Sequence, residues 1–307
     1  MRVLGHIHTL NDADVIEQIM GAIARQSHPV DAILIVDNGS TDATLNRPFS
    51  DNVTVIRHAN NLGTNGTVRT GFSHALKEGF DWIWIFDADS VPEPEALANL
   101  LAFYDRLPPA EQEKVCFLAC PPTAADDVKQ RRAIVFAGSG IEYLRPDPDA
   151  VASRCDCTFW SGSLYRLKAV EKIGLPSADY VLDVGELEYG YRARQAGFTS
   201  YIVHSGVIHH DVGRRPGFAP RVWRIGPIEF QLYDSSPIRC YYSMRNWIYF
   251  WLYQCKPRQL GRVFRSILRS LIFTTMFAVR PVTHYRHVFA CLRGIRDGLT
   301  MHIERRY

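Results

Sequence analysis

The sequence of 307 residues lacks several features that would assign it at once to a class of protein. Its start, MRVLGHIHTLNDAD, contains no apolar run of about 7–15 residues, which a secretory signal requires, and is instead typical of a strand. The seven cysteines are irregularly spaced, and the pair Cys155 and Cys157 has too few partners for a zinc site. We therefore expect a globular protein whose thiols stay free in a reducing cytoplasm.

Long apolar runs are also missing from the C-terminal part. Within residues 262–279 the longest uncharged stretch, 270–279, has ten residues, whereas a helix needs about 20 residues to span a bilayer. Residues 241–255 and 262–279 are predicted to form amphipathic or apolar helices. Their short apolar runs favour association with a membrane surface over crossing.

Acidic residues are scarce in the last third of the chain. Residues 214–307 hold 17 Lys and Arg against 4 Asp and Glu, a net charge of +13, whereas residues 1–213 hold 18 against 28, a net charge of −10. Such asymmetry suggests an anionic partner. No base-reading element accompanies the charge, which disfavours nucleic acid. We expect an anionic membrane surface at the inner face of the cell membrane; packing on the rest of the chain or on a second copy is the alternative.

Apolar strands and amphipathic helices alternate over the first 104 residues. This order is typical of an α/β fold with a mostly parallel sheet flanked by helices. We expect a domain over residues 1–213, with halves 1–104 and 105–213, followed by a basic helical region over 214–307. The predicted strands are 2–8, 32–37, 53–57 and 82–87, and the predicted helices are 12–26, 67–78 and 93–104.

The second half of that domain is predicted in less detail. Residues 105–158 are expected to be rich in loops. A strand, a turn and a helix are predicted within residues 158–174, a helix start within 179–197, and one strand ending in His209 and His210.

Polar clusters follow three of the predicted strands: HTLND, DNGSTD and DADS. The carboxyl ends of parallel strands share one edge of a sheet, where ligands bind, so we expect the three clusters to meet. Carboxylates such as Asp87 and Asp89 suit Mg²⁺ or Mn²⁺. A solvated turn is the alternative for these two acids taken alone. Residues 60–72 place three glycines at a helix start, where backbone amides and Arg69 could meet phosphates, or simply form a turn.

In this order, HTLND, IVDNGSTD, NNLGTNG and IFDADSVPEPEAL resemble the nucleotide-sugar half of family 2 glycosyltransferases, which are inverting enzymes with the GT-A (Rossmann-like) fold. WSGSLYRLKAVEKIG, LDVGELEYGYRARQAG and HHDVG resemble the acceptor half of that family. In the basic region, YYSMRN and RGIRDGL are similar to rhamnosyltransferase-like members, of which galactofuranosyltransferases are close relatives.

The resemblance implies that a sugar passes from a nucleoside diphosphate to a hydroxyl of a glycan or lipid-linked glycan, in bacterial cell-surface polysaccharide synthesis. The expected donor is dTDP-rhamnose, followed by UDP-galactofuranose or another UDP-hexose. The resemblance also implies a divalent cation, Mn²⁺ or Mg²⁺, held by Asp89, His210 and Asp87, with His209 as an alternative for the histidine. It places the donor nucleotide at Thr9, Asn11, Asp37, Gly63, Arg69 and Asp87.

The resemblance places the catalytic base in DVGELEYGYR, residues 183–192. Relatives often carry two adjacent acids and a third two residues later; here Gly185 takes the first place, and Glu186 and Glu188 take the others. Glu186 is the preferred base and Asp183 the alternative. Asp183 to Glu186 also has the spacing of a capping box, which would make both residues purely structural.

Four further residues are expected at the sugar and acceptor site. Trp160 and Gly162 would line it, although a tryptophan is more often a core residue. Glu188 would lie beside them, and Arg192 would meet an anion or pair with the acids.

Two other functions remain in competition. A sugar nucleotidyltransferase would carry a glycine-rich loop with a basic residue after the first strand, which HTLND lacks. An inactive nucleotide-sugar-binding module would be expected to have lost the acids that this sequence keeps.

Overall fold

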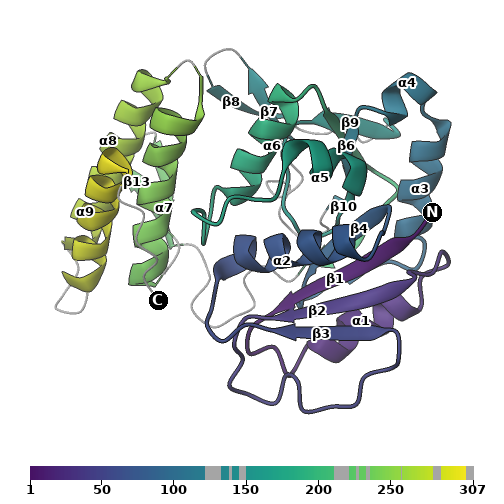
Figure 1. Cartoon of the computed structure of the whole chain (residues 1–307). Helices are drawn as coiled ribbons and strands as arrows, with labels where there is room; N and C mark the ends of the chain where they lie inside the picture. Colours follow the sequence, from purple (N-terminus) through teal and green to yellow (C-terminus); the bar gives the residue numbers. More distant parts are fainter. Residues whose placement is uncertain are drawn as a thin grey trace. The chain divides into compact units, whose positions relative to one another are not determined.

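The computed structural model describes residues 1–121, 133–137, 140–144, 150–210, 221–225, 228–232, 236–256, 258–278 and 285–301. The chain forms two compact units (Figure 1). The first comprises Met1–Val181 and Gly185–His210, and the second comprises Leu182–Val184 and Asp211–Tyr307. The second unit thus takes three residues from within the expected domain. The predicted boundary after residue 213 lies outside the described residues and stays a prediction, as does the division at residue 104.

An eight-stranded sheet forms the centre of the first unit, in the order β3-β2-β1-β4-β10-β6-β11-β9. Strands β3, β2, β1 and β4 are parallel to one another, β10 runs antiparallel to β4 and β6, β11 is parallel to β6, and β9 is antiparallel to β11. The sheet is therefore mostly parallel, as expected. Its strands are β1 (Val3–Thr9), β2 (Ala32–Asp37), β3 (Val53–Arg57), β4 (Trp82–Asp87), β6 (Val115–Ala119), β9 (Ala152–Cys155), β10 (Ser163–Arg166) and β11 (Thr199–Val203).

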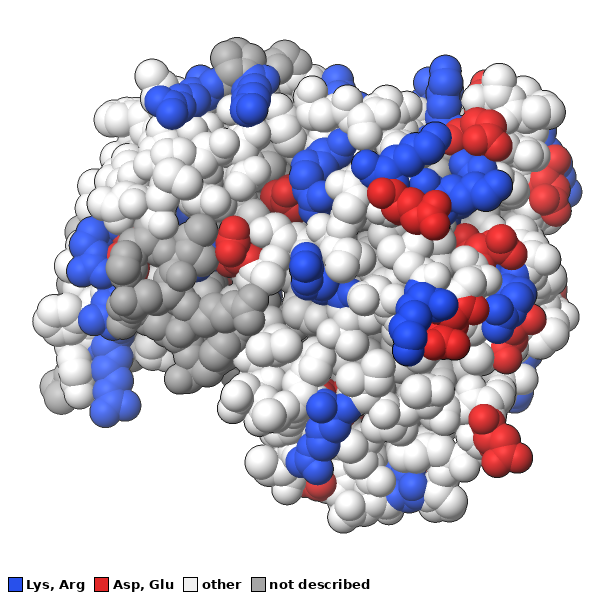
Figure 2. Space-filling view, in the orientation of Figure 1, with Lys and Arg blue, Asp and Glu red and all other residues white. Residues whose placement is uncertain are grey.

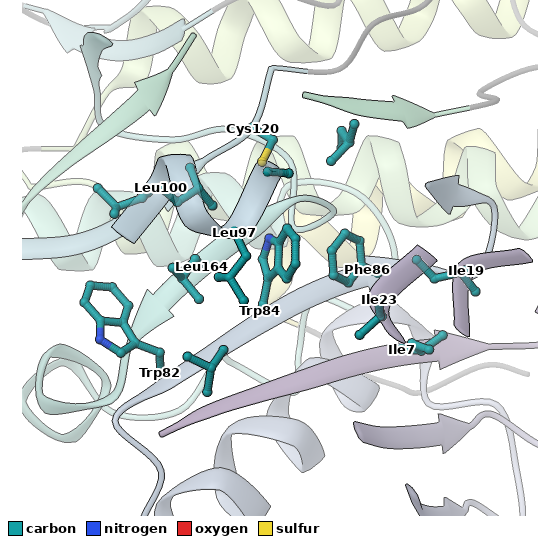
Figure 3. Close-up of a cluster of buried hydrophobic side chains, with 14 of the residues drawn as sticks. Ile7, Ile19, Ile23, Trp82, Trp84, Phe86, Leu97, Leu100, Cys120 and Leu164 are labelled. Atoms are coloured by element: carbon teal, nitrogen blue, oxygen red, sulfur yellow. The ribbon is translucent and has the colours of Figure 1, made fainter. Parts of the chain in front are cut away.

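Helices cover both faces of this sheet, which explains the uninterrupted apolar run in β4. Successive side chains of a strand point to opposite faces. Trp82, Trp84 and Phe86 accordingly pack in the cluster that holds α1 (Ile16–Ala24) and α3 (Ala96–Arg106) residues (Figure 3). Ile83 and Ile85 pack in the other cluster, with α2 (Gly63–Lys77), α5 (Leu167–Ile173) and α6 (Gly185–Gln195). A strand with two buried faces needs apolar residues at every position.

Smaller elements complete the first unit. Strand β5 (Ser90–Pro92) pairs with β12 (Ile208–His210), and β7 (Ala133–Ala137) pairs with β8 (Gly140–Leu144); α4 (Pro109–Gln112) precedes β6. The single strand predicted to end in two histidines is in fact two strands, β11 and β12. All seven cysteines of the chain are buried, and the structure shows no disulfide among them.

The second unit is built on three helices, α7 (Pro237–Tyr249), α8 (Leu260–Ala278) and α9 (Tyr285–Thr300), with a π-helical turn over Phe250–Gln254 and the strand pair β13 (Arg221–Ile225) and β14 (Ile228–Leu232). The helix predicted over residues 241–255 corresponds to α7 and its π-helical turn, and the next to α8. Helix α9 was not predicted. Among the described residues, none of the helices combines the length and apolarity that crossing a bilayer requires.

Helix α9 approaches α7 closely because two of its residues are glycines. A Cβ atom at Gly294 would lie 2.5 Å from the Tyr241 carbonyl oxygen, and one at Gly298 would lie 2.8 Å from that of Arg245. The buried Asp297 between them accepts a hydrogen bond from the Tyr241 hydroxyl at 2.9 Å. The segments YYSMRN and RGIRDGL are therefore the two sides of one helix–helix contact.

His6, in the middle of β1, is a titratable residue inside the core of the first unit. Its side chain is fully buried and packs against Gly71, where an added Cβ would lie 2.5 Å from the ring. Burial, together with the nearby His8, lowers the pKa of His6 to about 3. The imidazole is therefore neutral in the folded protein across the range in which a free histidine gains its proton.

Replacing His6 by leucine should reduce the stability that the protein loses on acidification. In the unfolded chain the imidazole binds a proton below its ordinary pKa of about 6.5, but the folded chain does not. The contribution of His6 is thus complete above that pH and falls as the pH falls towards 3. Between pH 7 and pH 5 the loss is about 2 kcal/mol. Urea unfolding at pH 7 and pH 5 measures it, and equal losses in both proteins would contradict this account.

Candidate functional site

The carboxyl ends of β1, β2 and β4 lie side by side at one edge of the sheet. Thr9 is in register with Asp37, and His8 with Asp87. The polar clusters that follow these strands therefore meet at that edge, as the sequence predicted.

Two aspartates and one histidine form a cluster at this edge. Asp87 ends β4, Asp89 precedes β5, and His210 ends β12. One His210 ring nitrogen lies 3.7 Å from Asp87 Oδ2, and the other lies 3.5 Å from Asp89 Oδ1. One ligand atom from each residue falls within 4.8 Å of the others. Two carboxylates and an imidazole are a donor set that fits Mn²⁺, and the carboxylates fit Mg²⁺.

Strand pairing decides which histidine joins the aspartates. In the β5–β12 ladder, His210 is opposite Ser90 and His209 is opposite Val91. Adjacent residues of a strand point to opposite sides, so His209 turns away and hydrogen-bonds to Glu93. The His209 side chain is 55% exposed, whereas that of His210 is 14% exposed. The structure thus brings His210, and not its neighbour, to the acids.

A chain of hydrogen bonds through two serine hydroxyl groups links His210 to the backbone of Asp87. The Asp87 backbone N–H donates to Ser161 Oγ at 3.1 Å, Ser161 Oγ donates to Ser90 Oγ at 2.7 Å, and Ser90 Oγ lies 2.5 Å from His210 Nδ1. Both serines are buried, so the chain fixes the orientation of the ring. Gly162 adopts a positive φ of 79°, and a Cβ there would lie 2.5 Å from Ile208. Glycine therefore allows β12 to approach, and the expected place of Gly162 at the sugar stays a prediction.

His8 is a member of this site that was not predicted. It faces Asp87 across the β1–β4 ladder and hydrogen-bonds through Nε2 to Asp87 Oδ1. Burial lowers the pKa of His8, but the carboxylates of Asp87, Asp12 and Asp89 together outweigh burial and raise the pKa above its ordinary value, with Asp87 contributing most of the three. The sequence did contain a signal for His8. His6 and His8 are two residues apart and therefore lie on the same face of a strand that ends at the site.

The residues predicted to contact the nucleotide shape the loops after β1 and β2. Thr9 Oγ1 donates to Asp12 Oδ2 at 3.0 Å, and Asn11 Oδ1 accepts from the Thr41 N–H at 2.8 Å. The fully buried Asp37 accepts from the Ser40 N–H at 3.1 Å and forms an ion pair with Arg57. In this structure the Asp37 carboxylate closes its own turn, and the predicted nucleotide contacts of these residues stay predictions.

The glycine-rich segment 60–72 leads into α2. Gly63 begins the helix with a φ of 71°, and a Cβ there would lie 2.0 Å from the Val181 carbonyl oxygen. The exposed Arg69 donates to the Pro176 carbonyl oxygen at 2.9 Å. Both residues therefore join α2 to the segment before α6.

Glu186 lies in the first turn of α6 and is partly buried. The preceding Gly185 has little room: a Cβ there would lie 2.2 Å from Asn65 Oδ1. Asn65 is itself fixed, because it accepts from Trp160 Nε1 at 3.0 Å and donates to the Ser177 carbonyl oxygen. This explains why an acid is absent at position 185. Asp183, the alternative base, pairs with Arg239 at 3.1 Å within the second unit.

Three residues expected near the sugar, Trp160, Glu188 and Arg192, make contacts within the first unit. Trp160 is 1% exposed, and its ring packs among Phe72, Tyr165 and Tyr189. The faces of the Trp160 ring are therefore covered by other side chains, as expected if Trp160 is a core residue. Arg192 binds both carboxylate oxygens of the buried Glu188, at 2.6 Å and 3.2 Å.

Helix α6 is tied to the end of α5 by this ion pair, because Arg192 also donates to the carbonyl oxygens of Ile173 and Leu175. Burial raises the pKa of Glu188, and Arg192 opposes that shift. Arg192 therefore pairs with one of the acids, which is one of the two expectations stated for it. These bonds do not connect Glu188 or Arg192 to the aspartate cluster.

Residues 6–133 match the family described as Glycosyl transferase family 2. Galactofuranosyltransferase GlfT1 of Mycobacterium tuberculosis is 26% identical over 190 residues, which cover 60% of this chain and 62% of that protein. Undecaprenyl-phosphate mannosyltransferase of Micrococcus luteus is 33% identical over 106 residues, which cover 33% of this chain and 43% of that protein. The chain therefore spans less than two thirds of these relatives.

The fold also matches a solved structure. GalNAc-T7, crystallised with UDP, GalNAc and Mn²⁺, superposes with a TM-score of 0.60 at 11% identity, over 98% of this chain and 56% of that one. At this identity the likeness concerns the fold, which is the GT-A-like arrangement expected from the sequence.

Replacing His210 by alanine should weaken Mn²⁺ binding at least about tenfold, because loss of even an outer partner of a metal ligand costs that much. Titration with Mn²⁺, followed by the electron paramagnetic resonance of the free ion, measures the affinity. His209→Ala is the matched control and should bind as the unmodified protein does. Equal affinities for the two variants would contradict the proposed metal site.

Proposed function

We propose that this chain, a member of glycosyltransferase family 2, transfers a sugar from a nucleoside-diphosphate donor to an acceptor hydroxyl with inversion, using a divalent cation. The observation that carries the proposal is the cluster of Asp87, Asp89 and His210 at the edge where β1, β2 and β4 end. A divalent cation at this place would stabilise the charge of a diphosphate, and the loops after β1 and β2 offer polar groups beside it for a nucleoside.

Asp89, His210 and Asp87 would hold the cation. When bound, it stabilises the negative charge that develops on the leaving diphosphate. His8 and the Ser90–Ser161 pair hold these ligands in place before the donor arrives. Preorganised groups of this kind lose little free energy to rearrangement during the reaction.

Glu186 is the proposed general base, which removes the proton of the acceptor hydroxyl as the hydroxyl attacks. Its place in the first turn of α6 stabilises the carboxylate through the helix dipole. A base in this position is worth roughly 10²–10⁴-fold in rate. Asp183 is the alternative base, and its carboxylate pairs with Arg239.

The donor sugar is proposed from the two alternatives that the sequence suggested. The motifs of the basic region favoured dTDP-rhamnose, whereas the name of the GlfT1 relative supports galactofuranose. We now favour UDP-galactofuranose, because that relative is matched over more than half of this chain. For the acceptor we propose a lipid-linked glycan, in line with the lipid named in the mannosyltransferase relative.

A lipid-linked acceptor agrees with the surface of α8 and α9. Four apolar residues of α8 recur at helical spacing and are 44–66% exposed: Leu260, Phe264, Leu268 and Leu271. Helix α9 repeats the pattern with Tyr285, Phe289, Leu292 and Leu299. Exposed arginines accompany both stripes, among them Arg265, Arg286 and Arg293, and basic side chains lie over these helices at the left edge of Figure 2. Apolar stripes bordered by arginine suit an anionic lipid surface.

The test of the function is release of nucleoside diphosphate. With UDP-galactofuranose or dTDP-rhamnose, Mn²⁺ and a lipid-linked glycan extract, the protein should free UDP or dTDP. Glu186→Gln should lower turnover by roughly 10²–10⁴-fold, and donor binding should remain. Release of pyrophosphate would indicate a nucleotidyltransferase instead, and donor binding without any turnover would indicate a binding module. Near-normal turnover by Glu186→Gln would reject the assigned base.

The protein should sediment with vesicles that contain phosphatidylglycerol and less with vesicles of phosphatidylcholine alone. The double variant Phe264→Ser/Phe289→Ser should lose this binding, because it removes the two most exposed aromatic residues of the stripes. Sedimentation that the double variant leaves unchanged would contradict the proposal. Dimers in lipid-free solution that the double variant dissociates would assign these faces to a second copy of the chain.

A further inference from the structure

The three residues Leu182–Val184, which lead into α6, have an unfavourable backbone. Asp183 and Val184 adopt φ values of 55° and 65°. Positive φ is uncommon for any residue other than glycine and is a clear outlier for a β-branched residue such as valine. Surrounding contacts must therefore hold this segment in place.

Those contacts come from α7, within the second unit. The Asn246 side-chain amide donates to the Leu182 carbonyl oxygen at 2.5 Å and to the Asp183 carbonyl oxygen at 3.1 Å. Arg239 adds an ion pair with the Asp183 carboxylate. Asn246 is fully buried, so both of its hydrogen bonds form away from competing water.

Arg245 fixes the direction in which the Asn246 amide points. Its Nε donates to Asn246 Oδ1 at 2.8 Å, and Arg245 is itself 2% exposed. An asparagine has one accepting and one donating end. With the oxygen taken by Arg245, the NH₂ group faces the two backbone carbonyls. The Arg-Asn pair that ends YYSMRN therefore acts as one unit.

We propose that Asn246 is a positioning residue for Glu186: it holds residues 182–184 in the strained conformation from which the chain enters α6. Val184 is bonded to Gly185, and Glu186 follows directly. The place of the Glu186 carboxylate thus depends on where this segment ends. The inference rests on the proposed function, since it takes Glu186 as the base. It gives the Arg-Asn pair of YYSMRN a role in the reaction that acts through the backbone of residues 182–184.

The experiment compares Asn246→Asp with Tyr241→Phe. Asn246→Asp keeps the shape of the side chain but replaces the donating group with an oxygen that repels the two carbonyls. We expect kcat to fall on the order of ten- to hundredfold, because small displacements of a catalytic group cost that much, while donor KM and Mn²⁺ affinity stay unchanged. Tyr241→Phe removes the hydrogen bond to Asp297 in the same unit and should leave kcat unchanged.

Two further measurements separate this inference from the proposed function. Amide hydrogen exchange over residues 182–188 should rise in Asn246→Asp and not in Tyr241→Phe, whatever the activity. In the double variant Glu186→Gln/Asn246→Asp, kcat should fall no further than in Glu186→Gln. If Glu186→Gln is inactive but Asn246→Asp keeps normal kcat and exchange, the positioning role is rejected and the proposed function stands. If Glu186→Gln is active, the proposed base fails first.

Discussion

Three residues of β12 pair with three residues of β5, and the arrangement of the proposed metal site depends on this short ladder. It brings His210 to a carboxylate pair that lies about 120 residues earlier in the chain. A shift of one residue in this pairing would exchange His210 for His209 and leave the aspartates without an imidazole. The buried hydroxyls of Ser90 and Ser161 and the glycine at position 162 act against such a shift, because they fit only one placement of β12.

Much of the first unit could be predicted from the sequence because its signals are local. An unbroken apolar strand such as Trp82–Asp87 reports two covered faces, and parallel strands must bring their polar ends to one edge. Whether Asp37, Glu188 and Trp160 meet a ligand or only other parts of the chain could not be decided from the sequence, because the answer depends on how deeply each side chain is buried. The same types of polar residue can bind a ligand or stabilise a loop, and their surroundings in the fold decide which of the two they do.

Helix α9 shows why a helix can escape prediction. The buried residues of α9 are Cys291, Gly294, Asp297 and Gly298, which are small or polar. Val288 and Ile295 add apolar side chains to the packing on α7, whereas the larger apolar residues of α9 are exposed, so the apolar pattern points away from the buried side. The basic character of the second unit is likewise uneven: Arg245 is buried and Arg296 pairs with Asp297, so only part of the positive charge is available to a partner.

The contact between Gly185 and Asn65 links two distant positions of the sequence. An acid at position 185 needs the space that the Asn65 amide occupies, and Asn65 is fixed by Trp160 and Ser177. Among proteins of this fold, the residues at these two positions should therefore vary together: an acid at the first requires a smaller side chain at the second. The number of carboxylates at the start of α6 is thus set as much by a residue of α2 as by the chemistry of the acceptor.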